Sequence, residues 1–242
     1  MKIVAKTDVG MVRESNQDSY TTGELPNGVA WAVVCDGMGG AAGGNVASST
    51  AVKVIAEQIT SSFRPGMSAN SIKNMLVSAI NAANISVYDI SCSNSELYGM
   101  GTTVVCAIVM EHTAYIAHAG DSRAYIVSHG DLTQLTRDHS VVQELVEHGK
   151  ITALEAKRHP NKNIITRAVG VSREILVDFC EQEMKDGDVL LLCTDGLTNF
   201  VESDEMCDLT KDDMFYEFAE RLVDRANKNG GGDNVTVVAV TY

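Results

Sequence analysis

Residues 29–40 read VAWAVVCDGMGG, an apolar run of seven residues that ends in Asp36 and a glycine-rich turn. An apolar run bounded by turn-forming residues predicts a buried strand. Asp-Gly is a common turn pair, so Asp36 has an ordinary explanation. A carboxylate at the tip of a buried strand can equally serve as a metal ligand. The rest of the chain decides between the two readings.

Three further strand-like runs carry an acid at one end, each beside a glycine or one residue from it. Asp121 follows IAHAG, Asp195 follows LLLCT, and Asp233 precedes NVTVV. Each acid alone is typical of a turn. Four acids crowded at neighbouring strand ends would repel and raise one another's pKa unless cations neutralised them. Oxygen-only ligands favour Mg²⁺ or Mn²⁺ over zinc or copper, and a pair of such ions suits the hydrolysis of phosphate esters.

The segment TDVGMVRESNQDSY, residues 7–20, offers a partner for a phosphate group. It contains Arg13 and, five residues later, a further acid, Asp18. The guanidinium fork of an arginine matches phosphate oxygens better than the point charge of a lysine. The plain alternative is a solvated surface arginine.

Composition excludes several classes of partner. The chain has 242 residues, 45% of them hydrophobic, and a formal net charge of -13. This charge repels nucleic acid and anionic membranes.

The amino terminus does not resemble a signal peptide and no apolar run approaches a membrane span, so we expect a cytoplasmic protein. The six cysteines have no Cys-x-x-Cys spacing and are expected to be reduced and buried.

The apolar spacing predicts helices over 52–63, 72–87 and 214–226. A hairpin is expected to turn at His129-Gly130-Asp131. Short breaks between successive strands favour antiparallel sheets and a single α+β domain over 1–242. Strands are predicted over 102–110, 113–119, 123–128, 174–180, 188–193 and 234–242.

Eight motifs, in this order, resemble those of the metal-dependent PPM family of serine/threonine protein phosphatases, the type 2C phosphatases. The resemblance covers residues 7–238 and is closest to the bacterial single-domain members. It implies a four-layer αββα sandwich of two antiparallel sheets flanked by helices, with a binuclear metal centre at one end. The motifs are TDVGMVRESNQD, VVCDGMGG, GMGTT, AHAGDSRAY, LTRDHS, ITRAVG, LLCTDGLT and GGDNVT.

The resemblance also implies a role for each motif residue, with two Mn²⁺ or Mg²⁺ ions and a possible third, weaker one. A metal-bridging hydroxide would attack phosphorus in line, without a covalent phospho-enzyme. The resemblance implies that Asp36 bridges both metals and that Asp195 and Asp233 complete the ligand shell of the first metal. It implies that Gly37 offers its carbonyl to the second metal, and that Asp18 lies beside this metal and acts partly through water. Asp121 is implied at the third metal, Asn234 in support of the site, and Arg13 in phosphate binding.

Three positions where this chain departs from the family pattern, and one histidine that it retains, bear on the chemistry. Gln17 replaces a common glutamate, which predicts weaker binding of the second metal. Met38 and Ala41 stand where many members have histidine, so the leaving serine or threonine oxygen is expected to take its proton from a metal-bound water. His139 is the nearest motif histidine, and a structural hydrogen-bonding role is expected for it.

The polar segment of about residues 148–163 corresponds to the mobile flap of bacterial members. As a flap it would lie beside the metals and help to select substrates through Lys157, Arg158 and Lys162. The alternative is a solvated helix and loop.

The resemblance implies phosphoserine and phosphothreonine proteins as substrates and a serine/threonine kinase as the opposing partner. We expect a monomer, because no sustained heptad pattern is present. Two alternatives stay open: a phosphatase of other phosphate monoesters, and a catalytically dead relative that binds partners.

Overall fold

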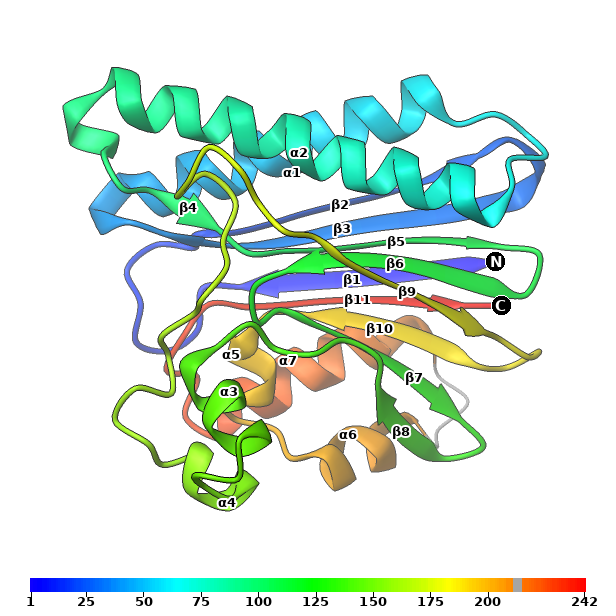
Figure 1. Ribbon diagram of the computed structural model, residues 1–242. Helices are drawn as coiled ribbons and strands as arrows, with labels where there is room; N and C mark the ends of the chain where they lie inside the picture. Colours follow the sequence, from blue (N-terminus) through cyan, green and yellow to red (C-terminus); the bar gives the residue numbers. More distant parts are fainter. Residues whose placement is uncertain (211–214) are drawn as a thin grey trace.

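The structure, a computed structural model, describes residues 1–210 and 215–242. Two antiparallel sheets pack face to face (Figure 1). The first sheet has the order β2 (Asp18–Leu25), β3 (Val29–Met38), β5 (Val104–Met110), β6 (Thr113–Ala119) and β9 (Asp178–Glu183), with β4 (Gly101–Thr102) paired to β3. The second has the order β1 (Lys2–Asp8), β11 (Val235–Thr241), β10 (Val189–Cys193), β7 (Arg123–Ser128) and β8 (Asp131–Gln134).

Helices cover the outer face of each sheet and complete four layers (Figure 1). The αββα arrangement implied by the resemblance is therefore confirmed. The first sheet is covered by α1 (Gly40–Ser62) and α2 (Ala69–Ser93), and the second by α5 (Asp195–Thr198), α6 (Ser203–Thr210) and α7 (Phe218–Lys228). The shorter α3 (Val141–Glu147) and α4 (Ala153–Ala156) lie at one end, and single 3₁₀ turns occupy Pro26–Gly28, Ser95–Leu97 and Phe215–Glu217.

Strand β3 is buried on both faces. Val33 and Cys35 pack into the core under α1 and α2, whereas Ala32 and Val34 pack between the two sheets. Successive side chains of a strand point to opposite faces, so a strand covered on both sides carries no polar alternation. This burial explains the uninterrupted apolar run that precedes Asp36.

The three predicted helices are present, with different ends. The prediction over 52–63 overlaps α1, which begins earlier and ends at Ser62, one residue before the predicted end. The prediction over 72–87 falls within the longer α2. In the third, Met214 lies outside the described residues, and the rest forms a 3₁₀ turn followed by α7.

The predicted strand over 174–180 is wrong in its first half, since β9 begins only at Asp178. Ile175 and Val177 are apolar because they pack against the core under α2. The prediction over 102–110 is divided into β4 and β5 at Thr103, whose backbone N–H donates to the carbonyl of Asp36 at 2.8 Å.

The hairpin between β7 and β8 is confirmed, with Ser128 paired to Asp131. His129 and Gly130 form its turn with φ of 52° and 85°. Positive φ at both central residues gives the turn that matches the twist of a two-stranded hairpin.

Candidate metal centre

The strand ends bring the predicted acids to one end of the sandwich. Asp36 lies near the end of β3 and pairs in register with Asp18 at the start of β2. Asp121 follows β6, Asp195 begins α5 directly after β10, and Asp233 precedes β11. A cavity of about 640 Å³ opens there. The predicted residues that line it are Arg13, Asp36, Gly37, Asp121, Asp195, Asp233 and Asn234.

Asp18 does not line the cavity but is buried behind it. Its Oδ2 accepts hydrogen bonds from Thr194 Oγ1 at 2.9 Å and Thr236 Oγ1 at 2.7 Å. Its Oδ1 has no hydrogen-bond partner among the described residues. Burial raises the pKa of Asp18 to about 7, against the opposing effect of the two threonines. A buried carboxylate oxygen without a donor is the kind of group that a cation can satisfy.

Burial and neighbouring negative charges also raise the pKa of three other acids of the cluster. Burial, and then repulsion by Asp18 and Asp195, raises the pKa of Asp36 well above its usual range. Burial and the charge of Asp195 raise the pKa of Asp121 to about 7. The pKa of Asp195 is also raised, by burial and by Asp233. Burial and mutual repulsion together disfavour the ionisation of all these carboxylates at once unless positive charge compensates them.

The backbone at Asp36 and Gly37 is tightly held. Asp36 N–H donates to Thr103 Oγ1 at 2.9 Å, and the Asp36 carbonyl accepts from Thr102 Oγ1 at 2.7 Å. A Cβ atom on Gly37 would lie only 2.1 Å from the carbonyl oxygen of Gly44. Only glycine fits at this position. The sequence reading quoted GMGTT as a motif but gave Thr102 and Thr103 no role.

Asn234 braces the loop before β2. Its Oδ1 accepts the backbone N–H of Gln17 at 2.8 Å, and its Nδ2 donates to the carbonyls of Val9 and Ser15, both at 2.9 Å. The amide thus fixes the segment that carries Arg13 to the start of β11. A supporting role of Asn234 at a metal site stays a prediction, for which these hydrogen bonds provide a structural basis.

Arg13 reaches the cavity from this loop. Its Nη2 donates to Asp233 Oδ2 at 2.8 Å, and its side chain is 54% exposed. The hydrogen bond and charge of Asp233 raise the pKa of Arg13. The guanidinium is therefore a permanent cation at an open edge of the acid cluster.

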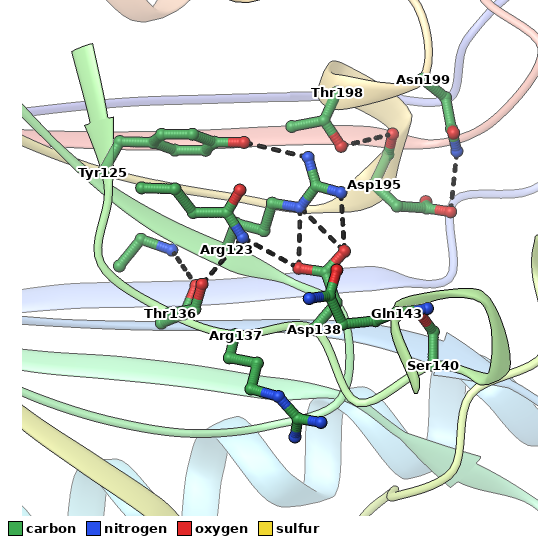
Figure 2. Close-up of polar contacts among 12 residues, drawn as sticks. Arg123, Tyr125, Thr136, Arg137, Asp138, Ser140, Gln143, Asp195, Thr198 and Asn199 are labelled. Carbon is green, nitrogen blue, oxygen red and sulfur yellow. Dashed lines mark hydrogen bonds and ion pairs between the residues drawn. The ribbon is translucent and has the colours of Figure 1, made fainter. Parts of the chain in front are cut away.

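Asp195 is positioned from within its own short helix. Asn199 Nδ2 donates to Asp195 Oδ2 at 2.9 Å, as Figure 2 shows. Asn199 was missed by the sequence reading. The signal for it is the four-residue spacing across α5, from its first residue to the residue that follows its end, which brings the two side chains to the same side.

Among the positions that depart from the family pattern, Gln17 and Met38 line the cavity. Gln17 Nε2 donates to the Gly40 carbonyl at 2.9 Å, so its amide ties the loop to the start of α1. The side chain of Ala41 lies outside the described part of the structure. No histidine occurs among the described residues that line the cavity.

His139 has the structural role expected of it. It is buried, its Nδ1 accepts the Gly120 N–H at 3.1 Å, and its Nε2 lies 3.1 Å from Asp178 Oδ2. Its ring stacks on that of His118, with the centroids 4.7 Å apart. Burial lowers the pKa of both histidines.

The segment over 148–163 is a helix and loop at the edge of the centre. Thr152 and Glu155 form a capping box that starts α4. Asn163 lines the main cavity, and Lys157 and Lys162 line a smaller one beside it. Arg158 lines neither cavity.

Comparison with known proteins agrees with this geometry. The family model described as "Protein phosphatase 2C" matches residues 12–236. A serine/threonine phosphatase, stp, of Listeria monocytogenes is 39% identical over 236 residues, covering 97% of this chain and 93% of that protein.

Two solved structures are also similar. A serine/threonine phosphatase of S. agalactiae has a TM-score of 0.93 and 32% identity, covering 100% of this chain and 99% of its own. The catalytic domain of the phosphatase PstP, solved in complex with two manganese ions, has a TM-score of 0.85 and 33% identity, covering 98% and 96% of the two chains. The chain described here belongs to the protein phosphatase 2C family of metal-dependent serine/threonine phosphatases.

Proposed function

We propose that this chain hydrolyses phosphoserine and phosphothreonine in proteins, with the acid cluster holding two Mn²⁺ or Mg²⁺ ions. The observation that carries the proposal is a cluster of five acids at one open cavity. Four of them line it and Asp18 is buried behind it, and the pKa of most of them is raised. The four lining acids are Asp36, Asp121, Asp195 and Asp233. A charge imbalance of this size is stable only with cations or bound protons.

The residues fit a hard divalent cation, because every candidate ligand atom is an oxygen and one buried carboxylate oxygen, Asp18 Oδ1, has no hydrogen-bond partner among the residues described. When bound, such ions supply positive charge opposite the phosphate and a water of lowered pKa. Asp36, Asp195 and Asp233 would hold the first ion. Asp36, the Gly37 carbonyl and Asp18 would hold the second, and Asp121 a weaker third.

The protein's own groups bind and orient the substrate. Arg13 would bind two non-bridging phosphate oxygens, because its exposed guanidinium has donors beyond the one used by Asp233. Asn234 and Gln17 keep the loop carrying Arg13 in place. Since no histidine lines the described cavity, the leaving oxygen would be protonated from water.

The neutral side chain of Gln17 supports weaker binding of the second ion. Its amide already donates to the Gly40 carbonyl and adds no negative charge to the cluster. We therefore propose that the second ion is exchanged more readily than in relatives with glutamate at this position.

We further propose that residues 1–242 act as one phosphatase domain and as a cytoplasmic monomer opposed by a serine/threonine kinase. The match over 12–236 supports the first point. Among the described helices none is long and apolar enough to cross a bilayer. The kinase rests on the family resemblance alone.

The test is hydrolysis of a phosphothreonine peptide and of small phosphate monoesters by the purified protein with Mn²⁺, with Mg²⁺ and with chelator. Asp36→Asn and Asp195→Asn should each lower kcat by roughly a hundredfold or more, because each removes an ion ligand. Asp89→Asn, an exposed acid on α2, is the control and should keep full activity. Turnover that survives chelator, or both substitutions, would overturn the proposal. A preference for the small esters would move the function to the alternative substrate class.

A further inference from the structure

A second cavity, of about 220 Å³, adjoins the candidate metal centre. Asp121, Asn163 and Asp195 line both cavities, so the two lie side by side. The smaller cavity has the size of a side chain rather than of a whole ligand. A phosphorylated residue held in the larger cavity would place its neighbours along the peptide at this second opening, since extended residues are about 3.3 Å apart.

The inner wall of this cavity is rigid and electrically balanced. Arg123 donates to both oxygens of Asp138, from Nε at 2.8 Å and 3.1 Å and from Nη2 at 2.6 Å. Arg123 Nη1 also donates to the Tyr125 hydroxyl at 3.0 Å (Figure 2). Gln134 Nε2 donates to Asp138 Oδ1 at 3.0 Å. Because Arg123 and Asp138 neutralise each other, neither side chain is available to bind an ion.

The outer wall is small and apolar. Val142 and Val146 lie on α3, and Ala156 ends α4. All three are only partly buried. A short aliphatic stem of an incoming side chain can therefore bury surface against them.

The free charge of the cavity is positive. Lys157 is paired with Glu202, which lies between α5 and α6. Lys162 also lines the cavity and has no ion-pair partner within the described residues. The two remaining acids, Asp121 and Asp195, are assigned to cations by the proposed function. Lys162 is therefore left to attract an anionic group.

We propose that this smaller cavity binds an aspartate or glutamate side chain that lies within a few residues of the phosphorylated residue of the substrate protein. The stem would pack on Val142, Val146 and Ala156, and the carboxylate would pair with Lys162. The inference rests on the proposed function, because the phosphorylated residue must occupy the larger cavity.

The test uses phosphothreonine peptides that carry a single glutamate one, two or three residues to either side, each matched with a glutamine peptide. At one or two positions the glutamate peptide should have a KM lower by roughly two- to fivefold, the range of a partly exposed ion pair. Lys162→Ala should bring the ratio of the two KM values to about one. Ala156→Leu, which fills the cavity, should do the same.

Lys150→Ala is the matched control, because Lys150 is an exposed lysine of the same segment that lines neither cavity. It should keep the wild-type ratio. If the wild type hydrolyses no peptide, the proposed function fails. If it hydrolyses each pair alike, or if Lys162→Ala keeps the preference, the inference fails while the proposed function stands.

Discussion

Two clusters of potential metal ligands lie in the described part of this molecule, and they differ in how their charges are balanced. In the first, His118, His139 and Asp178 bring ligand atoms within 4.8 Å of one another. Here His139 accepts from Gly120 and donates to Asp178, whose other oxygen accepts from Arg167 at 2.7 Å. Although burial opposes it, these hydrogen bonds lower the pKa of Asp178.

In the second, the acid cluster, Arg13 forms the one ion pair found between a described basic side chain and any of the five carboxylates. Arg13 pairs with Asp233, whereas one buried oxygen of Asp18 has no hydrogen-bond partner in the part of the chain that the structure describes. His118 Nδ1 also has no hydrogen-bond partner among residues 1–210 and 215–242, but its ring lies nearly parallel to that of His139, with an interplanar angle of 6°. Lone pairs in two parallel planes do not converge on one ion. Proximity of ligand atoms is therefore a weaker guide to a metal site than unbalanced charge.

The largest expected effect comes from Gly37→Ala. The new Cβ would overlap the Gly44 carbonyl and displace the backbone beside Asp36. We expect kcat with Mn²⁺ to fall by roughly a hundredfold or more, since small displacements of catalytic groups have effects of this size. Steady-state kinetics on a phosphothreonine peptide measures it.

Gly130→Ala is the control for Gly37→Ala. Gly130 has a φ of 85° in the hairpin turn, away from both cavities. Alanine there should lower the free energy of unfolding by about 1 kcal/mol and leave kcat unchanged. Full activity in Gly37→Ala would show that the tight backbone does not position Asp36.

The two clusters should have opposite effects on stability as pH changes. In the metal-free protein the pKa of Asp18 is raised from 3.8 to about 7, so the folded state binds more protons than the unfolded state between these values. The contribution of Asp18 to the free energy of unfolding is full below pH 4. It is lost as pH rises toward 7, by up to a few kcal/mol. The pKa of His139 is lowered by burial, so its contribution is full above about pH 6.5 and is lost as pH falls.

Urea unfolding of the metal-free protein from pH 4.5 to 8 separates the two effects. Asp18→Asn should flatten the loss of stability toward pH 7, whereas His139→Gln should flatten the loss toward low pH. Saturating Mn²⁺ should remove the dependence caused by Asp18. A pH profile that is the same in Asp18→Asn and wild type would contradict the raised pKa.

The positions of the acids at the strand ends were predictable from the sequence, because they depend on the local pattern of apolar and turn-forming residues. An apolar run ending in Asp36 or Asp195 marks the tip of a buried strand, and antiparallel neighbours bring such tips together. The hairpin at His129-Gly130 was predictable for the same reason. The roles of the acids came from the family resemblance and not from spacing.

Other features depend on contacts between distant residues. Thr194 and Thr236 both bind Asp18, although they are 176 and 218 residues away from it. The apolar residues of 174–177 predicted a strand because sequence pattern reports burial and not the partner that causes it. The cavity between Arg123 and α3 likewise exists only in the folded chain.

The most direct test of the charge argument is calorimetric titration of the metal-free protein with Mn²⁺, comparing wild type, Asp36→Asn and His139→Gln. We predict that wild type and His139→Gln bind at least two ions, and that Asp36→Asn loses at least one of them or binds more than tenfold more weakly. Unchanged binding by Asp36→Asn, or loss of an ion in a folded His139→Gln protein, would contradict the assignment of the metal centre to the acid cluster.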